Sequence, residues 1–154
     1  MKNISGILAS LLVTAWVGAL WAVGYLAVPV LFYAQPDRQL AGMLAGQMFS
    51  LVAYLGMVCG TYLLIHCVSL AGRETFRDVL FWTVAAMLLL TLAIQCGFQP
   101  LMTSLKLQAL PLDVMHSTFA GRFKMLHGVS SIFYLIQSLL GMFLVTRIAK
   151  PDNR

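Results

Sequence analysis

"VLFWTVAAMLLLTLAIQCGF", residues Val79–Phe98, contains no charged side chain. A helix needs about 20 mostly apolar residues to cross the hydrocarbon core of a bilayer, so this stretch is long enough for one crossing. Three further apolar runs lie at roughly Ile7–Phe32, Met48–Leu70 and Met125–Val145. The sequence therefore predicts four membrane spans.

The composition of the whole chain agrees with this prediction. Hydrophobic residues make up 60% of the 154 residues and charged residues 10%, with a mean hydropathy of +0.88. A soluble domain is only about 45–50% apolar. The net charge of +5 does not indicate nucleic-acid binding, because the basic residues sit at the span ends, where they anchor membrane helices. The first run is far longer than the core of a signal peptide, which is about 7–15 residues, and we interpret it as a retained span.

Helical patterning continues beyond the apolar cores. We expect an all-α fold, an integral membrane four-helix bundle, as a single domain over residues 1–154. The spans are expected at roughly 5–34, 38–71, 76–106 and 114–148, with Asp37 as a helix N-cap. A helix of about 34 residues is about 50 Å long, against a hydrocarbon core of about 30 Å. The helices should therefore extend beyond the membrane on the outer side, or tilt.

Charge predicts the orientation. Four spans place both termini on one side of the membrane. That side carries six basic residues, and the other side carries four. The six are Lys2, Arg73, Arg77, Arg147, Lys150 and Arg154, and the four are Arg38, Lys106, Arg122 and Lys124. Cytoplasmic loops carry the excess of basic residues, so we expect both termini to be cytoplasmic.

The second span carries a face of small residues. Gly42, Gly46, Gly56 and Gly60 share this face at intervals that follow a 3.5-residue period. Small residues let membrane helices approach closely, because lipid supplies no hydrophobic force that drives helices together. We expect close backbone approach along this packing seam within the bundle. A homodimer face is the alternative, which would make the protein a homo-oligomer in the lipid bilayer.

Polar side chains form stripes on the last two spans. The fourth span carries His127, Ser131, Tyr134, Ser138 and Gly141, and the third carries Thr91, Gln95 and Gln99. Lipid cannot satisfy such groups, so they should face protein or a water-filled cavity. Six residues are expected at the outer side and are predicted to line a ligand-binding site there: His127, Arg122, Arg38, Gln95, Gln99 and Ser131. In the structural alternative, His127 is a buried histidine that hydrogen-bonds Gln95 or Gln99.

The sequence gives little support for a bound cofactor, a metal site or catalysis. His66 and His127 are expected near opposite membrane surfaces and cannot share a haem, although ligation by one histidine stays open. Cys96, Met102, Met125 and His127 are a candidate soft-ligand set for copper(I), but methionine also fills gaps in apolar helices. No acidic residue lies inside a span, which argues against carboxylate-based proton coupling. The three cysteines all lie within spans and predict no disulfide scaffold. We therefore expect a non-enzymatic protein with no metal and no resident cofactor, with haem or copper as alternatives.

Three fragments resemble a known family, in the same order along the chain. They are "WVGALWAVGYLAVPVLF" (Trp16–Phe32), "DRQLAGMLAGQMF" (Asp37–Phe49) and "GRFKMLHGVSS" (Gly121–Ser131). They are similar to bacterial proteins of the transmembrane protein 205-like group, also described as domain of unknown function 4149. The resemblance implies a four-helix protein of the bacterial inner (cytoplasmic) membrane, and it supplies no mechanism. A eukaryotic relative is associated with drug export and platinum resistance, and its activity would transfer by analogy only.

The residues and the resemblance together predict a membrane protein that binds or helps to move a small molecule or ion through an outer-facing polar cavity. Two alternatives stay open. One is a redox membrane protein that holds a haem or a quinone. The other is a scaffold or assembly partner that works through the glycine face.

Overall fold

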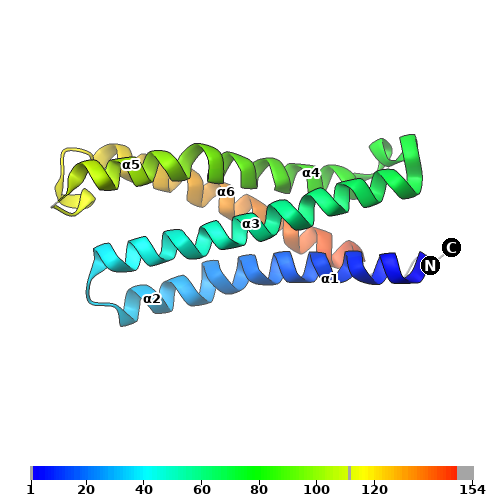
Figure 1. Ribbon diagram of the computed structural model, residues 1–154, viewed down its shortest axis with the longest axis horizontal. Helices are drawn as coiled ribbons and strands as arrows, with labels where there is room; N and C mark the ends of the chain where they lie inside the picture. Colours follow the sequence, from blue (N-terminus) through cyan, green and yellow to red (C-terminus); the bar gives the residue numbers. More distant parts are fainter. Residues whose placement is uncertain (1, 111, 149–154) are drawn as a thin grey trace.

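The computed structural model describes residues 2–110 and 112–148, and these residues form helices and short connections without a strand (Figure 1). Three of the basic groups counted on the side of the termini lie outside the described residues: the side chain of Lys2 and the residues Lys150 and Arg154. Four helical units are long and apolar enough to cross a membrane: Ser5–Ala34, Arg38–Arg77, Val79–Ala109 and Ala120–Ile148. This confirms the predicted four-helix membrane class.

Most of the units are composite. The first contains α1 (Lys2–Trp21), the π-helical turn η1 (Ala22–Ala27) and α2 (Val28–Ala34). The second contains α3 (Arg38–Ala71) and the 3-10 turn η2 (Gly72–Arg77). The third contains α4 (Val79–Leu92), the π-helical turn η3 (Ala93–Phe98) and α5 (Gln99–Ala109). The short 3-10 turn η4 (Val114–His116) then precedes α6 (Ala120–Ile148).

Aspartates start three of these elements. Asp37 is the N-cap of α3, because its carboxylate accepts the backbone N–H groups of Gln39 and Leu40 at 2.9 and 3.1 Å. This confirms the predicted cap. Asp113 caps only η4, which ends at once because Ser117 is extended. The fourth long helix therefore begins at Ala120, later than the expected residue 114.

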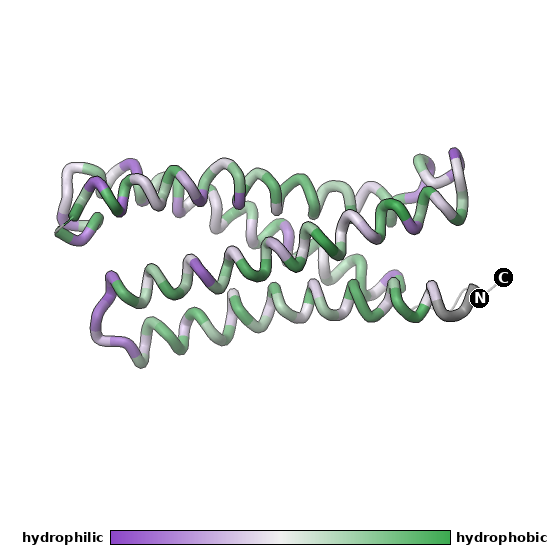
Figure 2. Tube along the Cα trace, in the orientation of Figure 1, coloured by the Kyte–Doolittle hydropathy of each residue, from purple (hydrophilic) through white to green (hydrophobic). Residues whose placement is uncertain are grey.

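The helices form an antiparallel bundle in which α1 and α4 each contact both α3 and α6. The start of α1, the end of α6 and η2 share one end, which we call the terminal end, and the opposite end is the distal end (Figure 1). Hydrophilic residues concentrate at the connections, and the helix shafts are largely hydrophobic (Figure 2). The core belongs to the terminal half, where it consists of Val13, Trp16, Val17, Cys59, Leu63, Val84, Met87 and Leu144.

In the distal half the bundle divides into two hairpins, since α2 packs on α3 and α5 packs on α6 (Figure 1). The first and third units, which run from the terminal end to the distal end, share the same irregularity where they enter this half. Each contains a six-residue π turn, then one residue, then a proline, Pro29 or Pro100. Proline lacks the N–H that continues the helical ladder, and π turns and prolines are common causes of helix bends. The sequence thus interrupts both outgoing helices at equivalent places.

The glycine face of α3 lies within the bundle, but it meets side chains rather than a neighbouring backbone. A Cβ atom at Gly56 would overlap the indole of Trp16, and one at Gly60 would lie 3.1 Å from the same ring. A Cβ at Gly46 would lie 3.4 Å from Nε2 of Gln99, and one at Gly42 would lie 3.8 Å from Nζ of Lys106. The expected close backbone approach is therefore wrong, because large side chains occupy the space that the glycines leave.

Candidate functional site

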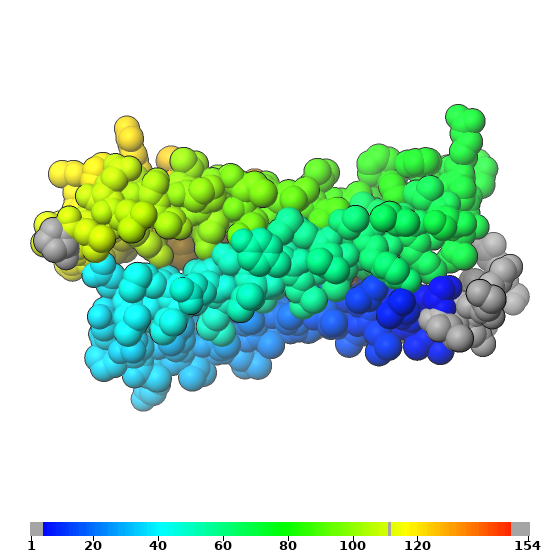
Figure 3. Space-filling model, in the orientation of Figure 1, coloured from blue at the N-terminus to red at the C-terminus, as the bar shows by residue number. Residues whose placement is uncertain are grey.

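The candidate site is the space between α2 and α3 on one side and α5 and α6 on the other, in the distal half. We call this space the interhairpin groove. In the space-filling view, a furrow separates the cyan residues of α3 from the yellow-green residues of α5, and atoms of α6 are visible at its bottom (Figure 3). The groove lies between two helical hairpins whose backbones diverge, and side chains set its width.

Two side chains of α5 bridge the groove to α3. The amide Nε2 of Gln99 donates to the carbonyl of Gly46 at 3.1 Å and lies 3.5 Å from the hydroxyl of Ser50. Nζ of Lys106 donates to the carbonyl of Gly42 at 3.1 Å. Both acceptors are helix carbonyls of glycines, and the missing side chains leave them accessible to a neighbouring helix. The glycine face thus serves polar contacts at its distal end.

On α6, Tyr134 marks the inner limit of the groove. Its hydroxyl donates to the carbonyl of Leu20, and its ring packs edge-on against Phe49 with centroids 5.2 Å apart. A side chain at Gly24 would overlap the tyrosine ring. Tyr25 completes this layer, because its hydroxyl donates to Ser138 at 2.9 Å. This layer joins α6 to the first span where the hairpins begin to diverge.

His127 lies beyond this layer. It precedes Tyr134 by seven residues, which is about two helical turns, so both residues are on the same face of α6. Deeper residues near this face are buried, with Gln137 and Ser138 at 4% and 5% exposure, whereas His127 is exposed. Its ring stacks on Phe123 with centroids 6.0 Å apart. The face of α6 that carries Tyr134 is therefore buried as far as Ser130, which is 9% exposed, and becomes exposed at His127.

Phe123 joins two polar groups of the groove. Nζ of Lys106 lies 5.5 Å from the centroid of the Phe123 ring, within the usual distance of a cation–π contact. The imidazole of His127 stacks on the same ring, four residues along the helix. One aromatic side chain thus connects an ammonium group from α5 with an imidazole from α6.

The six predicted site residues do not form one hydrogen-bonded cluster. His127 is exposed, and among the described residues its imidazole makes no hydrogen bond with Gln95 or Gln99, so the structural alternative of a buried, hydrogen-bonded histidine is wrong. The reason is that the Gln99 amide donates to α3, while the His127 ring lies on Phe123. Gln95 is half-buried on η3. Gln99 and His127 therefore lie on different helices without a hydrogen bond between them.

The remaining three predicted residues either bond within their own hairpin or are exposed. The hydroxyl of Ser131 donates to the carbonyl of His127 at 2.8 Å. Arg38 donates to the carbonyl of Phe32 at 3.2 Å, across the connection between α2 and α3. Arg122 is exposed near the start of α6. The two arginines are at the distal end, as expected from the sequence.

Sequence reasoning missed Lys106 and Gln137. Lys106 follows Gln99 by seven residues and so extends the stripe of Thr91, Gln95 and Gln99. Because it is charged, it was counted only among the basic residues at the span ends. Gln137 lies beside the stripe of α6, and its amide donates to Thr91 at 2.7 Å inside the bundle. Continuing the stripe of the third span by two turns, and widening the stripe of the fourth span by one residue, would have found these residues.

Metal ligands do not cluster within the described residues, which contain no group of three or more His, Cys, Asp or Glu side chains. The soft-ligand set is also dispersed. Met102 is buried at 8% exposure, whereas Met125 is 63% exposed and Cys96 is exposed. Met125 and His127 are two residues apart on α6 and point to nearly opposite sides of the helix, about 200° apart.

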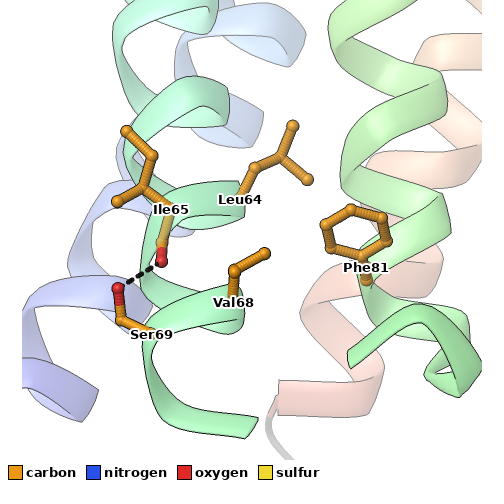
Figure 4. A pocket seen from close by; sticks show the side chains of 5 residues that line it. All are labelled: Leu64, Ile65, Val68, Ser69 and Phe81. Carbon is orange, nitrogen blue, oxygen red and sulfur yellow. Dashed lines mark hydrogen bonds between the residues drawn. The ribbon is translucent and has the colours of Figure 1, made fainter. Parts of the chain in front are cut away.

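Two shallow pockets lie toward the terminal end. The first has a volume of about 300 Å³ and is lined by Leu64, Ile65, Val68, Ser69 and Phe81 (Figure 4). Its polar side chain, Ser69, donates to the carbonyl of Ile65 at 2.8 Å and so is not aimed at the pocket. The second is lined by Ser10, Val13, Thr14, Val145 and Ile148. Ser10 and Thr14 likewise donate to carbonyls of their own helix. Neither pocket brings polar groups together as the groove does.

Comparison with known proteins identifies the family. Residues 11–111, more than half of the chain, match the family model described as Domain of unknown function (DUF4149), and the chain belongs to this family. The matched region includes Lys106 and the glycine face, and it ends before α6. No curated protein and no solved structure matches the chain.

Proposed function

We propose that this protein of the family of unknown function 4149 binds a small molecule in the interhairpin groove and helps it to move within or across the membrane. In this proposal the protein is not an enzyme and has no resident cofactor. The groove is the binding site, and its lining includes His127, Gln99 and Lys106. The two hairpins act as its walls.

One observation carries the proposal. The face of α6 that carries Tyr134 is buried as far as Ser130 and is exposed at His127, about one turn further along the same span. Lipid cannot hydrogen-bond an imidazole, so an exposed imidazole in this position without a hydrogen bond to a described residue calls for water or a ligand. A scaffold that works through the glycine face is less well supported, because Trp16, Gln99 and Lys106 already occupy that face.

The finer identity is part of the same proposal. We propose a bacterial member of the transmembrane protein 205-like group in the inner membrane, with both termini cytoplasmic. This orientation would open the groove to the outer side. The resemblance of the three fragments and the excess of basic residues on the terminal side support this assignment.

The experiment tests whether the groove is accessible to polar molecules. In a background in which Cys59, Cys67 and Cys96 are replaced by alanine, we expect a membrane-impermeant thiol reagent to label the His127→Cys variant. The matched control is Ile132→Cys, on the same helix at a position that is 58% exposed but faces away from Tyr134. This control should label far more slowly, because its thiol faces the acyl chains. Equal labelling rates would contradict the proposal.

A further inference from the structure

We infer that the ligand of the interhairpin groove is an amphiphile with an anionic group, and that Lys106 binds this group. The inference rests on the proposed function and deepens it. It starts from the position of one cation, the Lys106 ammonium, which joins three helices. Nζ of this residue donates to Gly42 of α3 and lies over Phe123 of α6, while its own backbone is in α5.

Among the described residues, no carboxylate lies within ion-pair distance of the Lys106 ammonium. Within residues 2–110 and 112–148, the ion pair that the structure contains is Arg77–Glu74, at 3.7 Å in η2. Asp113 influences Lys106 only through space, and its carboxylate caps η4 by accepting the N–H of Met115. A half-buried cation in a membrane span is costly, and Asp113 offsets only part of this cost because it forms no ion pair with Lys106. A ligand anion would supply that charge.

The rest of the distal end is also positively charged. Arg38, Arg122 and Lys124 are exposed there, and none of them forms an ion pair with a described residue. Asp37, the other carboxylate at this end, accepts two backbone N–H groups as the cap of α3. A cationic ligand would meet repulsion at the rim and again at Lys106. The distal end therefore favours anions over cations.

Donors for an oxyanion are present at one place. The ammonium of Lys106 has three N–H donors, and one of them is used by Gly42. His127 has no hydrogen-bond partner for its ring among the described residues, and it shares the Phe123 ring with Lys106. Phosphate and carboxylate oxygens accept such charge-assisted bonds. The anionic group would lie beside Phe123.

The walls explain why the ligand should also have an apolar part. Phe49 and Tyr134 close the inner end of the groove, and Met102 is buried on α5. The helices that form the groove are apolar spans, so its sides adjoin the bilayer. A hydrated inorganic anion would gain little from these walls. An amphiphile from the bilayer would pair its charge with Lys106 and keep its chain against apolar surface.

The experiment uses the full-length protein in a non-ionic detergent and three probes: monododecyl phosphate, 1-dodecanol and inorganic phosphate. We expect monododecyl phosphate to bind at least about tenfold more tightly than 1-dodecanol, since one charge-assisted hydrogen bond accounts for a factor of this size. Lys106→Met should remove most of this preference. Lys124→Met, which removes an exposed charge at the rim, should keep it within about twofold, because such charges contribute little.

Thermal unfolding and Lys106→Arg show whether a loss of binding is a loss of fold, since arginine keeps the charge. The Lys106 assignment is overturned if Lys106→Met keeps the preference, or if Lys124→Met loses it equally. Tight binding of inorganic phosphate alone overturns the amphiphile. If the His127→Cys thiol is labelled but no probe prefers the anion, the ligand class is wrong and the groove stands. If that thiol is not labelled, the proposed function itself fails.

Discussion

Replacing Gly56 with alanine should destabilise the bundle, because the new methyl group would overlap the indole of Trp16. Trp16 has 0% exposure and belongs to the buried core, so the rigid ring has little room to move. Overpacking of this kind costs about 1–3 kcal/mol. The higher helix propensity of alanine offsets up to about 1 kcal/mol of this cost. Because the buried ring cannot move away, the cost should lie in the upper part of this range, about 2–3 kcal/mol, and we expect a net loss of about 1–2 kcal/mol in the free energy of unfolding.

Reversible unfolding in mixed micelles, followed by circular dichroism, measures this change. The matched control is Gly18→Ala, because a Cβ at Gly18 meets nothing within 4 Å. This control should be neutral or slightly stabilising. Trp16→Leu provides a second test, since removal of the indole should relieve the overlap and make Gly56→Ala cheaper in the double variant. Equal effects of Gly56→Ala and Gly18→Ala would refute the reasoning.

The same series separates the two ends of the glycine face. Gly60→Ala should be mildly destabilising, because its Cβ would lie 3.1 Å from the Trp16 ring and 3.2 Å from Leu88. Gly46→Ala and Gly42→Ala should be tolerated, since their Cβ atoms would meet polar side-chain ends at 3.4 and 3.8 Å. A uniform cost at all four glycines would instead indicate the close backbone contact that the sequence predicts.

Three further perturbations test hydrogen bonds that join two helices or cap one. Gln137→Leu and Thr91→Val, combined in a double-mutant cycle of unfolding, should show a coupling of about 0.6–1.7 kcal/mol, and zero coupling would mean that their 2.7 Å bond contributes nothing. Asp37→Ala should lower stability by about 1 kcal/mol through the lost cap of α3, and Asp113→Ala, which caps only η4, should cost less in the same measurement. Tyr134→Phe should cost a similar amount to one membrane hydrogen bond, about 0.6 kcal/mol, and an unchanged unfolding curve would exclude a role for its bond to Leu20.

Apolar length and capping residues made the fold predictable from the sequence. A run such as Val79–Phe98 has few alternatives to a membrane helix, and Asp37 caps α3 where the pattern places it. The π turns before Pro29 and Pro100 were not predicted, because a π turn depends on which carbonyl meets which N–H along one helix, and hydropathy does not report this pairing.

The candidate site was only partly predictable. Helical periodicity correctly placed Gln99 and Tyr134 toward the bundle, since it reports which face of a helix a residue occupies. It does not report how far apart two helices are at a given depth. For this reason the sequence suggested a bond between His127 and Gln99, whereas the diverging hairpins separate them and bring Lys106 to α3 instead.

The placement of the core and of the polar bridges makes the distal half the part of the bundle in which the hairpins can separate. The buried apolar cluster belongs to the terminal half, so it fixes the four helices there and leaves the distal half to fewer contacts. Across the groove, α5 reaches α3 through Gln99 and Lys106, whose acceptors are backbone carbonyls. Side-chain bonds of this kind are weak in membranes, about 0.6 kcal/mol each. Occupation of the Lys106 ammonium by an anion would therefore act on the contact that holds the hairpins together, and binding and hairpin separation should be coupled.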